Sequence, residues 1–338
     1  MTELPKEWAF LRMSDDEILF AEGPFTSYST CPLDKSAIYF NHFDLSLSEP
    51  WLCPKKLHTL DNREFTKLFP SHDIELVWKV PSASAFSEVF SEISSAIQSG
   101  ILKKSVPVAS ESSHCNEEQF LSLPRHILPP PSNLIPYGFF KGGEGFIGAS
   151  PEYLFRSFEG KIRTMALAGT ATPAEREVFC VDQKEIQEHE FVAETLLDSL
   201  TPLGMIRRHD RKIHQVGSLI HFLTEIEVEL YQSHNPDDLI KHFHPTPALG
   251  PLPRTSETLE QLYGWRNSLD TPAYFGAPFG LYHEGHLDLL VAIRMSSYQN
   301  KTLQIPAGCG TIEASRLTNE WRELSLKRNS VKKLLKID

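Results

Sequence analysis

The hydrophobic and polar residues near the C-terminus follow the period of an amphipathic helix. A glycine-rich loop at 307–310 precedes this segment, and the predicted helix continues to about Leu335. At roughly 100° per residue, one face of the helix carries leucine and valine side chains and should be buried. The same face carries Glu320, Glu323 and Lys327. Charged groups on a face that packs on the core are costly unless partners compensate them.

Two explanations account for these charges. Glu323 and Lys327 lie four residues apart, a spacing that commonly gives a solvated ion pair on a helix surface. Alternatively, a divalent cation compensates the two glutamates, and an anionic ligand of that cation engages the lysine. This helix alone favours neither explanation over the other.

Strand patterns recur along most of the chain. Residues 1–80 contain short apolar runs between turns, such as 37–47 and 74–80, and predict strands of a sheet without recognisable chemistry. Further strands are predicted at 145–158, 161–170, 214–230, 273–295 and 299–308. Paired strands with interspersed helices predict an α+β fold with antiparallel sheets.

Two more helices are predicted between these strands. The first lies near 84–99, and the second lies at about 183–200 with Glu188 at the edge of its apolar stripe. A run that resembles a strand follows the first helix at 102–110. Pro107 within that run indicates an edge strand or a bulge, because proline cannot donate to a central ladder.

Composition and charge exclude several classes of partner. The 338 residues carry a net charge of −11 without a basic cluster, which argues against nucleic-acid binding. The N-terminal residues lack a signal pattern, and no run approaches the ~18 apolar residues of a membrane helix. The five cysteines form no CxxC pair, so they indicate a reducing compartment and neither a disulfide framework nor a zinc site. We therefore expect a cytoplasmic protein, monomeric or weakly dimeric, with no membrane partner.

Arg294 ends a strand that is apolar on both faces. A guanidinium at the end of a buried strand requires an anion. That anion is either a carboxylate of the core or one of a substrate.

A set of short motifs, in a fixed order, resembles one known family. They are GASPE (148–152), LAGT (167–170), EH (188–189), HPTPA (244–248), VAIR (291–294), AGCG (307–310) and EWRE (320–323), with Lys327 four residues after the last glutamate. In this order they resemble the chorismate-utilising enzymes, which include isochorismate, salicylate, anthranilate and aminodeoxychorismate synthases. The resemblance covers roughly residues 85–335.

The resemblance implies a fold and a domain organisation. The family fold is one large domain of two packed antiparallel sheets flanked by helices, with the active site between the sheets. We expect one domain over 1–338, in which 1–80 is a divergent part of the sheet and 85–335 is the catalytic core.

The resemblance also implies a Mg²⁺ site that holds the ring carboxylate of chorismate. Glu188 and Glu323 match the metal ligands, and Glu320 lies near the metal, through water. Arg294 and Lys327 match residues that bind substrate carboxylates. The remaining substrate-binding positions implied by the motifs are Ala168, Gly169, Thr170, His221, Gly308 and Gly310. Mg²⁺ usually takes only one or two carboxylates besides waters and an anionic substrate, which suits the acidic stripe.

The family reaction needs an acid and a base at opposite ends of an oxygen transfer. Glu152 matches the general acid, whose pKa must be raised for it to be protonated near neutral pH. Lys104, in KKSVPVA at 103–109, aligns with the lysine base and must be neutral to act. Adjacent strand residues face opposite ways, so a shift of one residue would make Lys103 the base. Ser105 and Pro107 depart from the usual residues of that motif.

Two features narrow the reaction. Ala168 stands where aminodeoxychorismate synthases carry a lysine nucleophile, and the sequence has no segment that resembles a glutamine-hydrolysing domain. We therefore expect an isochorismate synthase in which water attacks C2, serving menaquinone synthesis. A salicylate synthase, which goes on to eliminate pyruvate, is an alternative. The irregular KKSVPVA segment keeps open a chorismate-binding subunit that has lost catalysis.

Overall fold

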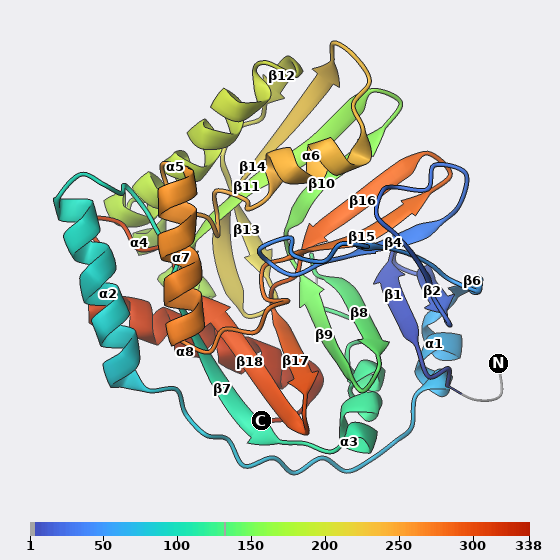
Figure 1. Ribbon diagram of the computed structural model, residues 1–338. Helices are drawn as coiled ribbons and strands as arrows, with labels where there is room; N and C mark the ends of the chain where they lie inside the picture. Colours follow the sequence, from blue (N-terminus) through green and yellow to red (C-terminus); the bar gives the residue numbers. More distant parts are fainter. Residues whose placement is uncertain (1–3, 132) are drawn as a thin grey trace.

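The computed structural model describes residues 4–131 and 133–338, and its strands form two antiparallel sheets (Figure 1). The first sheet has eight strands. In spatial order they are β6 (Lys56–Leu60), β2 (Ile18–Glu22), β1 (Trp8–Arg12), β8 (Ile135–Lys141), β9 (Glu144–Ser150), β17 (Met295–Gln299), β18 (Thr302–Gly308) and β7 (Val108–His114).

The second sheet has ten strands. In order they are β12 (Gly204–Arg208), β14 (Leu219–Leu230), β11 (Lys161–Ala171), β10 (Tyr153–Phe158), β16 (His286–Val291), β15 (Pro278–His283), β4 (Ala37–Phe40), β5 (Trp51–Cys53) and β3 (Thr26–Tyr28), while β13 (Lys212–Val216) pairs with β14. The N-terminal strands therefore enter both sheets. The predicted α+β class with two packed antiparallel sheets is confirmed.

The chain passes from one sheet to the other at two places that carry predicted site residues. Between β9 and β10 it crosses through Pro151 and Glu152, and between β16 and β17 it crosses through 292–294. Arg294 ends the second crossing with φ of +53°, a left-handed conformation that is uncommon for a residue with a side chain. The two crossings place Glu152 and Arg294 at the junction of the sheets.

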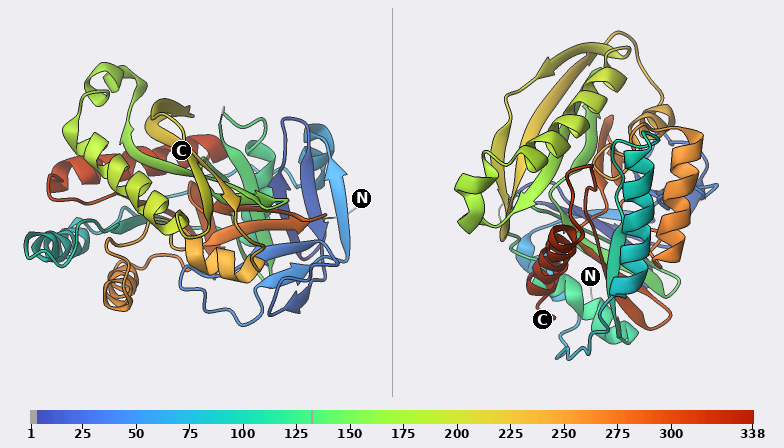
Figure 2. Two further views of the ribbon diagram at one scale, coloured as in Figure 1. Left: turned by 90° about the horizontal axis from the view of Figure 1, so that it is seen from above. Right: turned by 90° about the vertical axis from the view of Figure 1, so that its left-hand side faces the viewer.

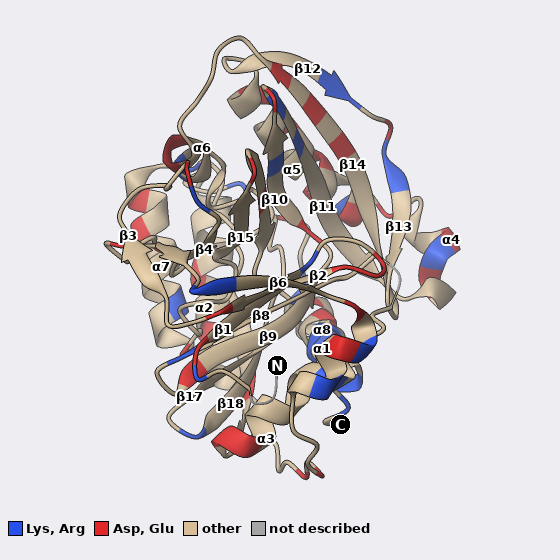
Figure 3. Ribbon diagram, turned by 90° about the vertical axis from the view of Figure 1, so that its right-hand side faces the viewer, with Lys and Arg blue, Asp and Glu red and all other residues tan. Residues whose placement is uncertain are grey.

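Apolar side chains from both sheets fill the space between them. Phe139 of β8 and Phe146 of β9 pack with Phe279 of β15 and with other fully buried residues of the second sheet. The two sides of β14 differ, because Ile226 and Val228 pack with apolar residues of helix α5 (Gln183–Leu200), whereas the opposite side is polar. Figure 3 shows acidic residues at intervals along β14, where Glu227 pairs with Arg163 and Glu225 pairs with Lys212. Burial on β14 is thus concentrated on the side that α5 covers.

Helices cover the sheets and supply the remaining site residues. The longer ones are α2 (Ala83–Gln98), α5 (Gln183–Leu200), α6 (Pro236–Phe243), α7 (Ser256–Ser268) and α8 (Leu317–Leu335). The shorter ones are α1 (Asn62–Leu68), α3 (Glu117–Ser122) and α4 (Arg176–Phe179), with 3₁₀ turns η1 (Leu123–His126) and η2 (Pro173–Glu175). Helix α5 packs on β11 and β14, and α8 packs on β18 and β7. In Figure 2, α2 and α7 lie side by side, and Trp265 of α7 donates a hydrogen bond to Glu92 of α2 over 2.7 Å.

The predicted helices at 84–99, 183–200 and up to Leu335 are confirmed as α2, α5 and α8. The strand predicted at 102–110 begins only at Val108, because residues 104 and 105 make single bridges to Leu252 and Thr311; β7 is nevertheless an edge strand, as Pro107 indicated. The strand predicted at 74–80 is wrong, since only Lys79 pairs with β7. Helices α6 and α7 were not predicted.

Within the described residues, no helix combines the length and the apolar character needed to cross a bilayer.

Candidate active site

A pocket at the junction of the two sheets gathers most of the predicted site residues. Its lining includes Glu152, Ala168, Gly169, Thr170, Glu188, His221, Arg294, Gly308, Gly310 and Lys327. These residues come from segments between 152 and 327 that are distant in sequence. Lys104, Glu320 and Glu323 are not part of the lining. Lys104 and Glu323 contact the lining residues Ala248 and Lys327, and Glu320 contacts Lys184 of α5.

Glu152 lies in the crossing between β9 and β10 and is buried. Its carboxyl oxygen Oε1 accepts a hydrogen bond from the hydroxyl of Thr246 over 3.1 Å. Burial raises the pKa of Glu152 to about 8, against the opposing effects of the Thr246 hydrogen bond and of the positive charges of Lys104 and Lys327. A protonated carboxylic acid therefore persists here at neutral pH.

Lys104 lies in the connection between α2 and β7, and its side chain is fully buried. The Lys104 Nζ donates hydrogen bonds to the backbone carbonyls of Pro247, over 3.0 Å, and Ala248, over 2.9 Å. Burial lowers the pKa of Lys104 to about 8, although the charges of Glu188 and Glu152 act in the opposite direction. Lys103 is exposed. Of the two lysines considered from the sequence, only Lys104 faces the interior.

Arg294 and His221 form a buried pair on another side of the pocket. The Arg294 guanidinium donates one hydrogen bond to Ser330 Oγ over 2.7 Å and one to His221 Nε2 over 3.1 Å. Burial and the neighbouring Arg294 charge hold the pKa of His221 well below its usual range, so the ring is neutral. Because Nε2 accepts from Arg294, the proton lies on Nδ1, which donates to the carbonyl of Gly169 over 2.7 Å. The side-chain contacts of Arg294 are thus to neutral groups, and its charge is available to an anion.

The LAGT segment departs from a regular strand where it meets the pocket. The register between β11 and β14 shifts between Ala168 and Ala171, and Gly169 has φ of +74°, a conformation that glycine adopts without strain. The irregularity turns the Thr170 amide toward α5, where it donates to Glu185 Oε2 over 2.8 Å. Ala168 remains in the lining, so a methyl group stands at the position where a lysine nucleophile would have to be.

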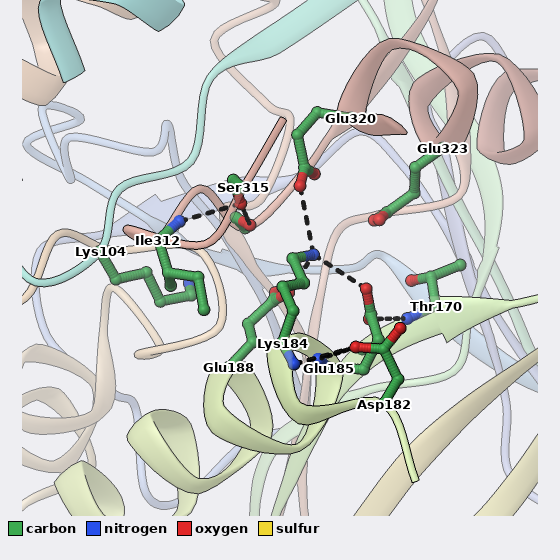
Figure 4. A network of polar contacts seen from close by, with 12 residues as sticks. Lys104, Thr170, Asp182, Lys184, Glu185, Glu188, Ile312, Ser315, Glu320 and Glu323 are labelled. Atoms are coloured by element: carbon green, nitrogen blue, oxygen red, sulfur yellow. Dashed lines mark hydrogen bonds and ion pairs between the residues drawn. The ribbon is translucent and has the colours of Figure 1, made fainter. Parts of the chain in front are cut away.

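Carboxylates from two distant helices converge beside the pocket. Glu188 of α5 and Glu320 and Glu323 of α8 are buried, with exposed fractions of 5%, 1% and 8%. The sequence pattern placed Glu188 only at the edge of its helix stripe, and the structure buries it. The carboxylates of Glu188 and Glu320 contact the same ammonium group. Lys184 Nζ lies 3.0 Å from Glu188 and 3.2 Å from Glu320 (Figure 4).

Lys327 neutralises the third carboxylate. Its Nζ lies 2.5 Å from Glu323 Oε1 and donates to the Gly308 carbonyl over 2.8 Å. The pair spans one helical turn, yet it is buried rather than solvated, with 18% and 10% of the side chains exposed. This excludes the solvated surface pair that the i,i+4 spacing suggested.

The electrostatics of this cluster show an excess of negative charge. Burial, together with the charge of Glu323, raises the pKa of Glu320 to about 7. Burial likewise raises the pKa of Glu185 to about 8, while the Lys184 ammonium acts against that shift. Oε2 of Glu320 is buried and has no hydrogen-bond partner among the residues that the structure describes. A buried acceptor without a partner is unfavourable, so this site has capacity for a further cation or donor.

The donor set suits a hard divalent cation by its chemistry. It consists of oxygen atoms only, it is acidic, and it adjoins a pocket with free positive charge, as Mg²⁺ sites that also bind an anionic substrate require. In the part of the chain that the structure describes, no three acidic, histidine or cysteine side chains already stand in a metal-binding arrangement. Glu188 and Glu320 are oriented instead around Lys184, and Glu323 pairs with Lys327.

Gly310 shows how closely the backbone approaches this cluster. A Cβ atom at this position would lie 1.8 Å from Oε1 of Glu188 and 2.5 Å from its Cδ. Any larger residue here would therefore force the Glu188 carboxylate to move. The second glycine of the AGCG motif therefore lies against an acidic side chain and also lines the pocket.

Three polar residues of the site were not predicted from the sequence. Thr246 is part of the HPTPA motif, but its contact with Glu152 spans 94 positions and has no local pattern. Lys184 lies four residues before Glu188, which is an ordinary helix pair on its own, and Glu185 is its neighbour. Their importance arises only when α8 brings Glu320 to the same point.

Comparison with known proteins identifies the family. Residues 47–336 match the model of the family described as "Chorismate binding enzyme". The chain is 29% identical over 208 residues to the salicylate biosynthesis isochorismate synthase of Pseudomonas aeruginosa, covering 58% of this chain and 43% of that protein. It is 25% identical over 205 residues to anthranilate synthase component 1 of Aquifex aeolicus, covering 56% and 41%. The matched segments thus span less than half the length of these relatives.

A solved structure shares the fold over nearly the whole chain. The menaquinone-specific isochorismate synthase MenF of Escherichia coli superposes with a TM-score of 0.83 at 18% identity, covering 99% of this chain and 90% of that one. The family match covers most of the chain and includes every motif from GASPE to EWRE. The chain belongs to the family of chorismate-binding enzymes.

Proposed function

We propose that the protein is an isochorismate synthase, which isomerises chorismate by adding water at C2 and expelling the C4 hydroxyl. The observation that carries this proposal is the buried pair of Lys104 and Glu152. Burial moves both pKa values to about 8, so a neutral amine and a protonated carboxylic acid coexist near that pH. The proposed reaction requires a base and an acid in those protonation states.

The proton transfers balance over the reaction. The neutral Lys104 amine takes one proton from the attacking water as the new C2–O bond forms. The Glu152 carboxylic acid gives one proton to the departing C4 hydroxyl, which leaves as water. Lys104 ends protonated and Glu152 ends ionised. Transfer of one proton from Lys104 to Glu152 through solvent restores the starting state.

Positive groups of the pocket support binding of a dicarboxylate. Among the described residues, the hydrogen bonds of the Arg294 guanidinium go to the neutral groups of Ser330 and His221, so the guanidinium is suited to a substrate carboxylate. The neutral His221 ring accepts a hydrogen bond from that guanidinium and so helps to hold it in place. Lys327 lines the same pocket and adds a second positive charge.

Glu188 and Glu323 would hold a Mg²⁺ ion, with Glu320 close by. When bound, the ion would neutralise the ring carboxylate of the substrate while charge shifts during the reaction. The buried position of all three carboxylates supports this assignment. Gly169, Thr170, Gly308 and Gly310 would bring backbone close to the substrate ring.

The nature of the nucleophile separates this reaction from those of related enzymes. Relatives of the chain include both an isochorismate synthase and an anthranilate synthase component, so identity alone does not choose between them. A methyl group at Ala168 supplies no covalent nucleophile, which argues against the aminodeoxychorismate route. The buried Lys104 offers a base for water, which favours isochorismate as the product.

The test is product analysis. The purified protein is incubated with chorismate and Mg²⁺, and the products are separated chromatographically. Isochorismate alone is the expected result. Salicylate together with pyruvate would identify a salicylate synthase. Chorismate binding by calorimetry without turnover would identify a binding protein that lacks catalysis. The proposed destination of the product in menaquinone synthesis is tested by measuring quinone content in a strain that lacks the gene.

A further inference from the structure

Lys184 occupies the point on which the carboxylates of two helices converge. Its nitrogen lies 3.0 Å from Glu185 Oε1, 3.0 Å from Glu188 Oε2 and 3.2 Å from Glu320 Oε1. The side chain is 17% exposed, so little water reaches the ammonium group. Figure 4 shows it between Glu320 of α8 and the acidic side chains of α5.

This ammonium is what holds the acidic cluster together. Buried carboxylates repel each other, and removing the cation between them would leave them without compensation. Lys184 is also the residue that joins α5 to α8 electrostatically, since it contacts one carboxylate of α8 and two of its own helix. The relative position of Glu188 and Glu320 therefore depends on a positive charge at this point.

A divalent ion at the same carboxylates would compete with the ammonium. Mg²⁺ binds oxygen at about 2.0–2.1 Å, which requires direct approach to the oxygens that the ammonium now contacts. An ammonium and a divalent cation at one point also repel each other strongly in a site with little water. Both cations cannot use the same carboxylate oxygens at once.

We propose that Lys184 is an exchangeable internal cation: its ammonium holds Glu188 and Glu320 in position while the metal is absent, and it withdraws when a divalent cation binds. This inference rests on the metal-dependent function proposed above. It assigns to Lys184 a positioning role that ends when the metal arrives. Metal binding is then a replacement of one cation by another and leaves the carboxylates compensated throughout.

The structure gives the lysine a place to go. A second pocket lies against the same cluster, and its lining includes Lys184, Asp182, Glu185, Glu320 and Glu323. Asp182 caps the start of α5 and lies two positions before Lys184 in the sequence. Its carboxylate offers a partner for the withdrawn ammonium on the solvent side.

Chemical labelling of the unmodified protein tests the withdrawal. The protein is treated with an amine-acetylating reagent in EDTA or in Mg²⁺, and acetylation at each lysine is followed by mass spectrometry. We expect Mg²⁺ to increase the acetylation rate of Lys184 at least tenfold while that of the exposed Lys103 stays constant. An unchanged or slower rate at Lys184 would mean that the ammonium stays in place, and the inference would be wrong.

A variant tests the holding role independently of activity. Lys184→Met should lower Tm in EDTA, and Mg²⁺ should raise its Tm by more than it raises that of the unmodified protein. Lys332→Met is the control, because Lys332 pairs with Glu111 and stacks on Trp78 elsewhere on α8, so Mg²⁺ should not restore its loss. A smaller Mg²⁺ response in Lys184→Met would overturn the inference. If Tm of the unmodified protein does not respond to Mg²⁺ at all, the proposed metal dependence itself fails.

Discussion

Lys104 and Glu152 are fixed by the same short loop, although they lie 48 positions apart in the chain. Pro247 and Ala248 accept the hydrogen bonds of the Lys104 ammonium, and Thr246 donates to the Glu152 carboxyl group. The HPTPA motif thus fixes the distance between the proposed base and the proposed acid. Its backbone carbonyls bind Lys104, and its threonine hydroxyl binds Glu152.

We expect Lys104→Ala to lower kcat by about 10²–10⁴-fold, the usual contribution of a positioned acid or base. Substrate binding in the presence of Mg²⁺ should persist, as measured by calorimetry. Lys103→Ala is the matched control and should leave kcat unchanged, because its side chain is exposed. Full activity of Lys104→Ala combined with loss in Lys103→Ala would reverse the assignment of the base.

The pH dependence of kcat/KM follows from the two pKa values. The neutral form of Lys104 accumulates as pH rises through about 8, and the protonated form of Glu152 is lost as pH rises through about 8. Activity should therefore peak near pH 8 and fall on both sides, with apparent pKa values that belong to the pair. Steady-state rates between acid and alkaline pH measure this. A rate that rises without an alkaline decline would argue against Glu152 as the acid.

Thr246→Val should shift the alkaline limb of that profile to higher pH. The Thr246 hydrogen bond lowers the pKa of Glu152, so its removal leaves the carboxyl group protonated over a wider range. Thr246→Ser keeps a hydroxyl and should retain the profile of the unmodified enzyme. Equal profiles for the valine and serine variants would show that the contact has no part in setting the protonation of Glu152.

Glu188→Ala and Glu323→Ala should each abolish the rise in Tm that Mg²⁺ produces. The reason is that Glu188 of α5 and Glu323 of α8 would together hold the ion, so the loss of either carboxylate should weaken its binding. Titration by differential scanning fluorimetry measures the response. Glu227→Ala serves as the control, since Glu227 belongs to a solvent-exposed ion pair with Arg163 away from the site. A normal Mg²⁺ response in either site variant would exclude that residue as a ligand.

Gly310→Ala should weaken Mg²⁺ binding without unfolding the protein. The new methyl group would lie 1.8 Å from Glu188 Oε1, so the carboxylate must move. Gly264→Ala in α7 is the control, because a Cβ there meets nothing within 4 Å, and alanine favours a helix. Calorimetric Mg²⁺ titrations compare the two. Identical Mg²⁺ affinities in the two variants would mean that Glu188 does not need its present position.

The sequence predicted those features that depend on local patterns. Helix α5 was predicted from its apolar stripe and begins, as such helices do, after a capping residue, Asp182. Alternation along KKSVPVA predicted that only one of the two lysines faces inward. The sequence did not decide which one, because the register is set by the bridge of Lys104 to Leu252, which lies 148 positions away.

Long-range contacts explain what the sequence did not predict. The contacts of Thr246 with Glu152, of Lys184 with Glu320 and of Glu185 with Thr170 form only when segments that are separate in the chain pack together. Helix α7 was missed because its buried face includes Thr258 and Arg266, which weakens the apolar period. Residues 74–80 alternate like a strand, yet they pair at one point only, so their pattern reflects packing of alternate side chains without a ladder.

Glu152 and Arg294 lie in two of the segments through which the backbone passes from one sheet to the other. Each is therefore attached on one side to the eight-stranded layer and on the other to the ten-stranded layer. Any sliding of one layer over the other is transmitted directly to the reacting groups. Substitutions among the aromatic side chains between the layers, such as Phe146 against Phe279, should consequently alter turnover while leaving every ligand contact intact.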